Sequence, residues 1–321
     1  MGAQKLPYIR PDVQNLLAML AAQPGPQMQD MPPTDARAMM TGMAQFAERP
    51  RGDLAEIRNL SIPGPHGHTI PARLYRNNLT DTPAPVIVFY HGGGWVIGDL
   101  EIYESLCAEI SRTLDISVVS VDYRLAPEHR FPAATEDCIA AARWVASSPA
   151  EIGHPVTGVI PAGDSAGGNL AAAISLETHG TLAAPILAQW LIYPATDMSA
   201  TTGSMAEFAD GYLLTAAGME YFNGHYMPEG ADITHVWASP INAASLAGQP
   251  ATLVFTCGLD PLRDQGRAYA AKLIAAGVRT IFREADGQIH GCITLRAAIP
   301  SAQDDLHACL TDLRILINEA A

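Results

Sequence analysis

Cysteine and basic residues are both scarce in this chain of 321 residues. Its five cysteines are odd in number, widely scattered and never arranged as Cys-x-x-Cys, which favours reduced thiols over a disulfide framework. Only 19 Lys and Arg stand against 33 Asp and Glu, for a formal charge of −14. Because nucleic-acid binding needs clustered positive charge, this balance argues against an exposed nucleic-acid surface.

Long apolar runs are also missing. The longest ones are far too short to cross a bilayer, and Met1–Arg10 has no charged segment followed by an apolar core. No internal repeat and no low-complexity stretch occurs. Hydrophobic residues nevertheless make up 48% of the chain, which is ample for a folded core. We therefore expect a cytoplasmic globular protein without a membrane span.

The apolar pattern changes from helical to alternating along the chain. Apolar stripes around Leu16–Leu20 and Ala36–Met43 predict helices within residues 1–50, with a break at Gln23–Pro26. Strands then alternate with helices, which predicts a mainly parallel eight-stranded sheet covered on both faces. Residues 199–240 interrupt this alternation and are expected to form a helical insertion. The expected strands are Ala55–Ile62, Ile70–Tyr75, Val86–Tyr90, Ser117–Val121, Thr157–Ile160, Ile186–Ile192, Thr252–Thr256 and Arg279–Arg283.

The stretch Gly163–Gly168 contains Gly-x-Ser-x-Gly between a predicted strand and a predicted helix. This is the context of a nucleophile elbow, in which a sharp turn pushes Ser165 out of the sheet and crowds its neighbours. Only glycine fits at positions 163 and 167 of such a turn. The bare motif also occurs as an ordinary turn in α/β proteins, so the rest of the chain has to supply the partners of the serine.

A serine nucleophile needs a base and an orienting carboxylate, which in this architecture follow it in the order Asp or Glu, then His. Asp260 comes just after a predicted strand, and Asp264 is a rival that fits better as a helix cap. His290 follows the last predicted strand on a loop bracketed by glycines. The other histidines that we weighed suit surface or capping positions, and His66-x-His68 alone is a weak metal pattern.

Acyl transfer by serine also needs backbone donors for the oxyanion. We expect these donors to be the N–H groups of Ala166, directly after the serine, and of Gly93 and Gly94 in the loop after the strand Val86–Tyr90. A phosphate-binding glycine loop is the competing interpretation. It is disfavoured because the chain has neither Gly-x-Gly-x-x-Gly after its first strand nor a Walker lysine.

Several motifs together resemble the bacterial hormone-sensitive-lipase-like esterases, and the resemblance extends over nearly the whole chain. They are His91–Trp95, Tyr123–His129, the GDSAGG form of Gly163–Gly168, Asp260–Asp264 and Ala270–Val278. The resemblance implies an α/β-hydrolase fold with a helical cap. It divides the chain into N-terminal cap helices (1–50), a catalytic core (51–198 and 241–321) and a cap insertion (199–240).

The same resemblance implies a serine carboxylesterase that hydrolyses short- to medium-chain acyl esters without a metal or an organic cofactor. It assigns Ser165, Asp260 and His290 as nucleophile, acid and base, and makes Tyr123–His129 a structural brace. It also makes a homodimer formed through an edge strand plausible. Contacts with the ester substrate are expected from five residues, which are Gly92, Trp95, Tyr212, Leu214 and Cys292.

Two positions depart from the family pattern, since Cys292 replaces the usual Phe and Arg130 replaces the preferred Pro. We hypothesise that Cys292 leaves room for bulkier esters, with a small buried apolar thiol as the alternative; an ester series on Cys292→Phe separates the two. Other interpretations of the chain are a catalytically inactive small-molecule receptor, a true lipase, an amidase and a specialised deacetylase. They stay open because one fold supports many functions.

Overall fold

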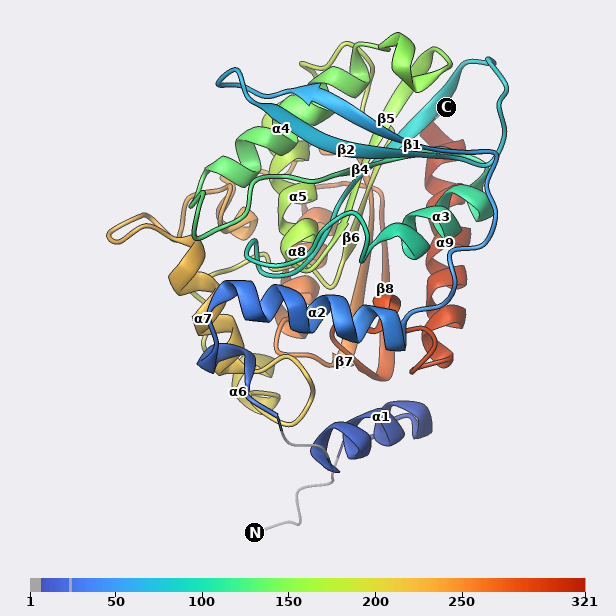
Figure 1. The fold of residues 1–321 in the computed structure, drawn as a ribbon. Helices are drawn as coiled ribbons and strands as arrows, with labels where there is room; N and C mark the ends of the chain where they lie inside the picture. The colour runs from blue at the N-terminus through green and yellow to red at the C-terminus, as the bar shows by residue number, and fades with distance from the viewer. Residues whose placement is uncertain (1–6, 23–24, 321) are drawn as a thin grey trace.

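The computed structural model describes residues 7–22 and 25–320 (Figure 1). The remaining residues lie outside the description: 1–6 of the expected N-terminal segment, Gln23 and Pro24 of the expected helix break, and Ala321. Within the described ranges, no helix combines the length and the apolar character that crossing a bilayer requires.

Eight strands form one sheet in the order β1-β2-β4-β3-β5-β6-β7-β8. Strand β2 is antiparallel to β1 and β4, whereas the pairings from β4 through β8 are parallel. The mainly parallel eight-stranded sheet predicted from the alternating pattern is therefore confirmed. The strands are β1 (Glu56–Pro63), β2 (Thr69–Arg76), β3 (Ala84–Tyr90), β4 (Ser117–Val121), β5 (Val156–Asp164), β6 (Ala188–Ile192), β7 (Ala251–Leu259) and β8 (Thr280–Ile289).

Helices cover both faces of this sheet because its central strands are apolar on both sides. All residues of β4 and β6 are buried, which requires a packing layer above and below them. Helices α3 and α9 form the layer on one face, and α4, α5 and α8 form the layer on the other (Figure 1). Their bounds are α3 (Glu104–Leu114), α4 (Ala133–Ala146), α5 (Ala166–Thr178), α8 (Arg263–Ala275) and α9 (Ser301–Ala320).

Strands β7 and β8 continue past the ends that the sequence pattern predicted for them, to Leu259 and Ile289. Gly258 and Gly287 resemble strand breakers in the sequence, yet they lie side by side within this pair. A Cβ on Gly258 would come 3.2 Å from the backbone nitrogen of Gly287. The pairing register shifts at this point, which marks a bulge instead of an end. The expected loop before His290 is thus wrong, because the strand itself leads directly to that residue.

The other α-helices of the described residues belong to the two regions that the family resemblance assigned to a cap. Helix η1 packs against α7, so the N-terminal region and the insertion meet. Figure 1 shows α2 crossing the molecule near α6 and α7, with α1 below it. The N-terminal segments are α1 (Pro11–Ala22), η1 (Met28–Asp30) and α2 (Pro33–Ala47), and those of the insertion are α6 (Ser204–Glu207) and α7 (Ala216–Tyr226). Short turns of 3-10 helix follow at the end of the insertion, η3 (Pro240–Asn242), and in the core, η2 (Ala150–Ile152) and η4 (Cys292–Thr294).

The two ends of the insertion are fastened next to each other. The Nδ2 of Asn169, on α5, donates to the carbonyl oxygens of Ala195 and Ala238 at 2.9 and 2.8 Å. The N–H of Ile241 donates to the carbonyl oxygen of Thr196 at 3.1 Å. The helix that follows the predicted nucleophile therefore holds the segments that enter and leave the insertion.

A buried ion pair joins the end of α2 to the core. The Nε of Arg296 lies 3.0 Å from Oε1 of Glu48, and the two side chains are only 1% and 6% exposed. An Nη of Arg296 also donates to Oγ of Ser105 at 3.0 Å. Burial raises the pKa of Glu48, against the opposing effect of Arg296. Removing one member of such a pair leaves the other charge buried without compensation.

We predict that Arg296→Leu lowers the free energy of unfolding by about 3–5 kcal/mol, because it leaves the Glu48 carboxylate buried without its partner. Arg279→Leu is the matched control, since its partner Glu319 is about half exposed, as is Arg279 itself. Such a surface pair contributes little to stability, because water screens both charges. Urea unfolding of both variants measures the difference. An equal loss in the two variants would contradict the importance of the buried pair.

Candidate active site

Ser165 stands between the end of β5 and the start of α5, with a backbone φ of +56°. A residue other than glycine is strained in this region and persists only where its surroundings hold it. The N–H of Ser165 donates to the carbonyl oxygen of Ile192 at 2.9 Å. A Cβ on Gly167 would lie 1.8 Å from the carbonyl oxygen of Tyr90, and one on Gly163 would lie 2.4 Å from that of Gly167. Both positions therefore require glycine.

Ser165, Asp260 and His290 come together at the ends of β5, β7 and β8. The Oγ of Ser165 lies 2.9 Å from Nε2 of His290, and Nδ1 of His290 lies 2.8 Å from Oδ2 of Asp260. Asp260 is fully buried, and its Oδ1 accepts the N–H of Leu262 at 2.8 Å. These distances are those of a nucleophile, a base and a carboxylate that orients the base.

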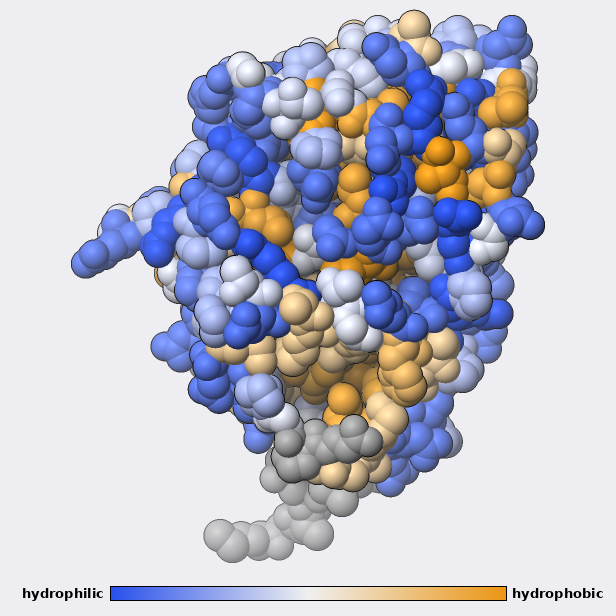
Figure 2. Space-filling view, in the orientation of Figure 1, coloured by the Kyte–Doolittle hydropathy of each residue, from blue (hydrophilic) through white to orange (hydrophobic). Residues whose placement is uncertain are grey.

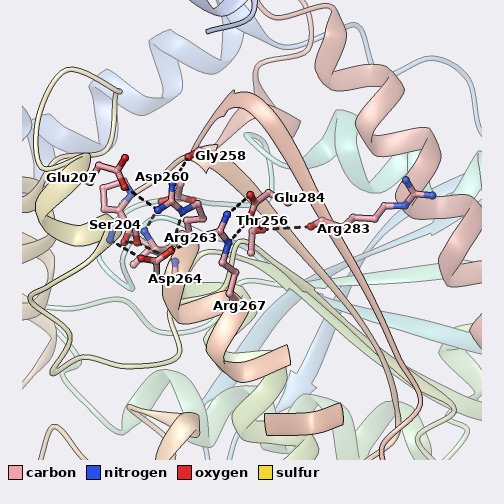
Figure 3. Close-up of polar contacts among 12 residues, drawn as sticks. Ser204, Glu207, Thr256, Gly258, Asp260, Arg263, Asp264, Arg267, Arg283 and Glu284 are labelled. Carbon is pink, nitrogen blue, oxygen red and sulfur yellow. Dashed lines mark hydrogen bonds and ion pairs between the residues drawn. The ribbon is translucent and has the colours of Figure 1, made fainter. Parts of the chain in front are cut away.

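Asp264, the rival carboxylate, lies apart from the histidine and has other partners. Its Oδ2 accepts the N–H of Ser204 at the start of α6, at 2.8 Å, and its Oδ1 lies 2.9 Å from Nε of Arg263. Arg263 also pairs with Glu207 of α6 at 3.0 Å. Asp264 therefore caps a helix of the insertion instead of its own helix, and the segment after Asp260 is tied to the insertion (Figure 3).

The glycine loop after β3 has the backbone shape that only glycine adopts easily. Gly93 and Gly94 have φ angles of +108° and +58°. A Cβ on Gly93 would lie 2.2 Å from the carbonyl oxygen of Ile97. Among the described residues, the N–H groups of Gly93, Gly94 and Ala166 have no acceptor within the protein. They are thus available to an oxygen atom bound beside the serine.

Asp164, next to the serine, anchors this loop. Its Oδ1 accepts the N–H of Gly92 at 2.7 Å, and its Oδ2 accepts the hydroxyl of Tyr103 at 3.1 Å. Burial raises the pKa of Asp164 to about 6. Gly92 was expected to contact the substrate, but its N–H is already engaged and the residue is buried. The sequence analysis missed Asp164, although the GDSAGG motif contains it.

A second anchor lies behind the loop and involves the motif Tyr123–His129. The hydroxyl of Tyr123 donates to the carbonyl oxygen of His91 at 2.7 Å, and the two rings stack with centroids 4.3 Å apart. Nδ1 of His91 lies 2.8 Å from the carbonyl oxygen of Gly92. Burial lowers the pKa of His91 to about 4, so this ring is neutral at pH 7. These contacts are those of a brace for the glycine loop.

Trp95, Tyr212 and Leu214, the other expected substrate contacts, each pack against neighbouring apolar or aromatic side chains. Trp95 is buried and stacks on Tyr226 of α7, Tyr212 meets Phe208 edge to face, and Leu214 is partly buried against the core. Figure 2 shows apolar side chains around a hollow beneath α2, between α2 and α1. Partly buried apolar residues of these two helices are Leu17, Leu20, Met40 and Met43.

Cys292 does not line an open space beside the histidine. It is fully buried, and its Sγ lies 3.7 Å from Sγ of Cys257, which is also fully buried. Its position fits the small apolar thiol that the sequence offered as the alternative, so the structure gives no support to extra room for bulky esters.

In the part of the chain that the structure describes, no cluster of three or more His, Cys, Asp or Glu side chains is arranged to hold a metal ion.

Comparison with known proteins agrees with this geometry. The family described by the alpha/beta hydrolase fold matches residues 87–294. The carboxylic ester hydrolase LipN of Mycobacterium tuberculosis is 41% identical over 267 residues, which cover 81% of this chain and 70% of LipN. The ethyl acetate hydrolase of Pseudomonas putida is 36% identical over 255 residues, which cover 78% of this chain and 80% of that enzyme.

Solved structures of esterases are similar to this chain over almost its whole length. A thermostable esterase from Pseudomonas putida ECU1011 superposes with a TM-score of 0.92 at 32% identity, covering 98% of this chain and 99% of the other. An ester hydrolase from the metagenome of Lake Arreo, solved with a bipyridine phosphonate derivative, superposes with a TM-score of 0.91 at 35% identity. That match covers 96% of this chain and 98% of the other.

The chain therefore belongs to the α/β-hydrolase fold family. Within that family it is a carboxylesterase of the hormone-sensitive-lipase-like group that its motifs resemble. The assignment agrees with the fold, with the order of serine, aspartate and histidine along the chain, and with the glycine loop after β3.

We predict that the stability contributed by Asp164 depends on pH. Its pKa is higher in the folded chain, about 6, than the ordinary value of about 3.9, so the folded state binds the proton more tightly. That contribution is fully present below pH 4 and is lost as the pH rises through 6. The free energy of unfolding of the wild type, minus that of Asp164→Asn, should therefore be about 1 kcal/mol larger at pH 5 than at pH 7.

Denaturant unfolding of both proteins at the two pH values measures this difference, and the other titrating groups cancel because both proteins carry them. A difference that stays constant between pH 5 and pH 7 would show that the Asp164 carboxylate is not perturbed.

Proposed function

We propose that Ser165, Asp260 and His290 carry out acyl transfer and that the substrates are short- to medium-chain acyl esters. The observation that carries this proposal is the continuous chain of contacts from the hydroxyl through the imidazole to a buried carboxylate, at 2.9 and 2.8 Å. Asp260 and His290 follow the ends of β7 and β8, which are neighbouring parallel strands. The carboxyl ends of parallel strands are where α/β sheets place their sites.

In the acylation step, the ester carbonyl lies beside Ser165 with its oxygen towards Gly93, Gly94 and Ala166. His290 accepts the proton of the hydroxyl through Nε2 as Oγ attacks the carbonyl carbon. Asp260 fixes the tautomer through Nδ1 and stabilises the imidazolium that forms. The three N–H groups stabilise the tetrahedral oxyanion. As the oxyanion collapses, the bond between the carbonyl carbon and the ester oxygen breaks, His290 gives its proton to that oxygen, and the alcohol leaves the acyl-enzyme.

Deacylation repeats the same chemistry with water as the attacking group. His290 takes a proton from the water, and the hydroxide attacks the acyl carbon on Ser165. The oxyanion forms again in the same place, and its collapse releases the acid and returns the proton to Oγ. No group other than these side chains and backbone donors takes part in the proposed cycle.

We further propose that residues 1–50 and 199–240 together form a cap over this site, with the core made of 51–198 and 241–321. The contact between η1 and α7 and the fastened ends of the insertion support this division. The apolar hollow between α1 and α2 offers a path for the acyl chain (Figure 2). An apolar path of this kind favours uncharged esters, which also suits the net charge of −14.

We predict that turnover of p-nitrophenyl esters is highest for short and medium acyl chains and falls for palmitate. Ser165→Ala should lower kcat by at least four orders of magnitude, and Asp260→Asn by about 10⁴, since the imidazole then has the wrong tautomer. Initial rates over the ester series provide the measurement.

The alternatives have different outcomes in the same assay. An inactive receptor would show no turnover above Ser165→Ala, and a true lipase would prefer palmitate and respond to an oil interface. An amidase or a specialised deacetylase would turn over an anilide or an acetylated substrate faster than these esters.

We also propose that two copies pair through the edge strand β8. Phe282 on this strand is 38% exposed, and Ile315 on the neighbouring α9 is 43% exposed. Large apolar side chains exposed at a sheet edge favour pairing with a second chain. Light scattering should give twice the monomer mass for the wild type and a monomer for Phe282→Glu. A wild type that is monomeric at tens of micromolar concentration contradicts the pairing.

A cytoplasmic location remains part of the proposal, and cell fractionation of the native host tests it. It is supported by the five cysteines, all of which are buried as free thiols, because such thiols suit a reducing compartment.

A further inference from the structure

Trp95, directly after the three glycines, has a backbone φ of +60°. The left-handed region is unfavourable for a large side chain, so this conformation persists only if neighbouring contacts hold it. The strain lies next to the proposed oxyanion donors Gly93 and Gly94, which have positive φ angles themselves. Whatever holds Trp95 in place therefore also decides where those two N–H groups point.

Two side chains of the insertion rest on this loop. The ring of Tyr226 stacks on the ring of Trp95 with centroids 4.3 Å apart and only 4° between the planes. Phe222 lies one helical turn earlier on α7, and a Cβ on Gly94 would come 2.2 Å from its ring. Residues four apart share one face of a helix, so α7 presents both rings to consecutive residues of the loop.

The end of α7 is itself fixed to the core. The N–H of Phe131 donates to the carbonyl oxygen of Tyr226 at 2.9 Å, and an Nη of Arg130 donates to that of Met227 at 3.1 Å. The carbonyl oxygen of Trp95 accepts the N–H of Ala126 at 2.8 Å. The brace segment thus holds Trp95 through Ala126, and the next residues, Arg130 and Phe131, hold the end of α7. Arg130 is one of the two departures from the family pattern.

We propose that Tyr226 and Trp95 form a positioning pair, through which the insertion helix α7 holds the oxyanion loop in its strained, donor-presenting shape. This inference rests on the proposed function, because it takes Gly93 and Gly94 to be the oxyanion donors. Neither ring transfers a proton or forms a bond. The pair acts on the transition state only, since the loop has to be in place when negative charge develops on the substrate oxygen.

The expected fall in kcat can be estimated from the contribution of the oxyanion donors. Loss of one oxyanion donor costs about 10²–10³ in turnover. Loosening the loop leaves the N–H groups present but badly aimed for part of the time, so we expect kcat to fall by roughly 10- to 100-fold. Because the ground-state ester makes little use of these donors, KM should change by less than about threefold.

Tyr226→Leu is the principal variant, because leucine fills much of the space but has no flat ring to stack. Tyr226→Phe keeps the ring and should restore wild-type kcat. Tyr269→Leu is the matched control, since Tyr269 is equally buried but lies in α8, outside the contacts of the loop. It should lose stability to a similar degree while keeping its kcat.

Steady-state kinetics on p-nitrophenyl butyrate and inhibition by an aryl trifluoromethyl ketone are the measurements. The ketone adds to the serine hydroxyl to give a hemiketal whose oxyanion needs the same donors. We expect its Ki to rise in Tyr226→Leu by the factor by which kcat/KM falls. In a double-mutant cycle, Trp95→Ala combined with Tyr226→Leu should cost no more than either change alone, because both remove the same stack.

The outcomes separate this inference from the proposed function. Wild-type kcat and Ki in a folded Tyr226→Leu, with Ser165→Ala inactive, would overturn the positioning pair alone. Equal losses of kcat in Tyr226→Leu and Tyr269→Leu would overturn it too, since they reflect general damage. An active Ser165→Ala would overturn the proposed site, and this inference with it.

Discussion

The left-handed backbone at Ser165 is the constraint on which the site depends. A serine at a φ of +56° is held there because β5 ends one residue before it and α5 begins one residue after it. The approach of Gly167 to the carbonyl oxygen of Tyr90 leaves no space for a side chain. Through this turn, one backbone conformation sets the position of the hydroxyl and the first N–H of α5 together.

The glycine loop after β3 has a comparable dependence on its surroundings. It is held by the Asp164 carboxylate at Gly92, by Tyr123 at His91 and by Tyr226 at Trp95. The first contact comes from the turn at Ser165, the second from the segment Tyr123–His129 and the third from the insertion. A loop of strained residues gains one defined shape because three separate elements converge on it. This convergence links the shape of the loop to the packing of the insertion.

The alternating apolar pattern was sufficient to predict the mainly parallel sheet, and the spacing of motifs was sufficient to bring Ser165, Asp260 and His290 together as candidates. The end of β8 was misplaced because Gly287 belongs to a bulge, and a bulge is not distinguishable from a strand end by composition. The anchoring by Asp164 was missed because its partners Gly92 and Tyr103 are 72 and 61 residues away in the sequence. The sequence left two interpretations of Cys292 open because its neighbour Cys257 lies on β7, 35 residues earlier in the chain.

The most direct test of the central claim is to trap the acyl-enzyme. Brief reaction with p-nitrophenyl acetate, acid quenching and peptide mass spectrometry should show the mass of one acetyl group on the peptide that contains Ser165. The label should be absent from Ser165→Ala and should disappear from the wild type with time as water releases it. Acetylation confined to another residue, or equal labelling in Ser165→Ala, would contradict the assignment of the nucleophile.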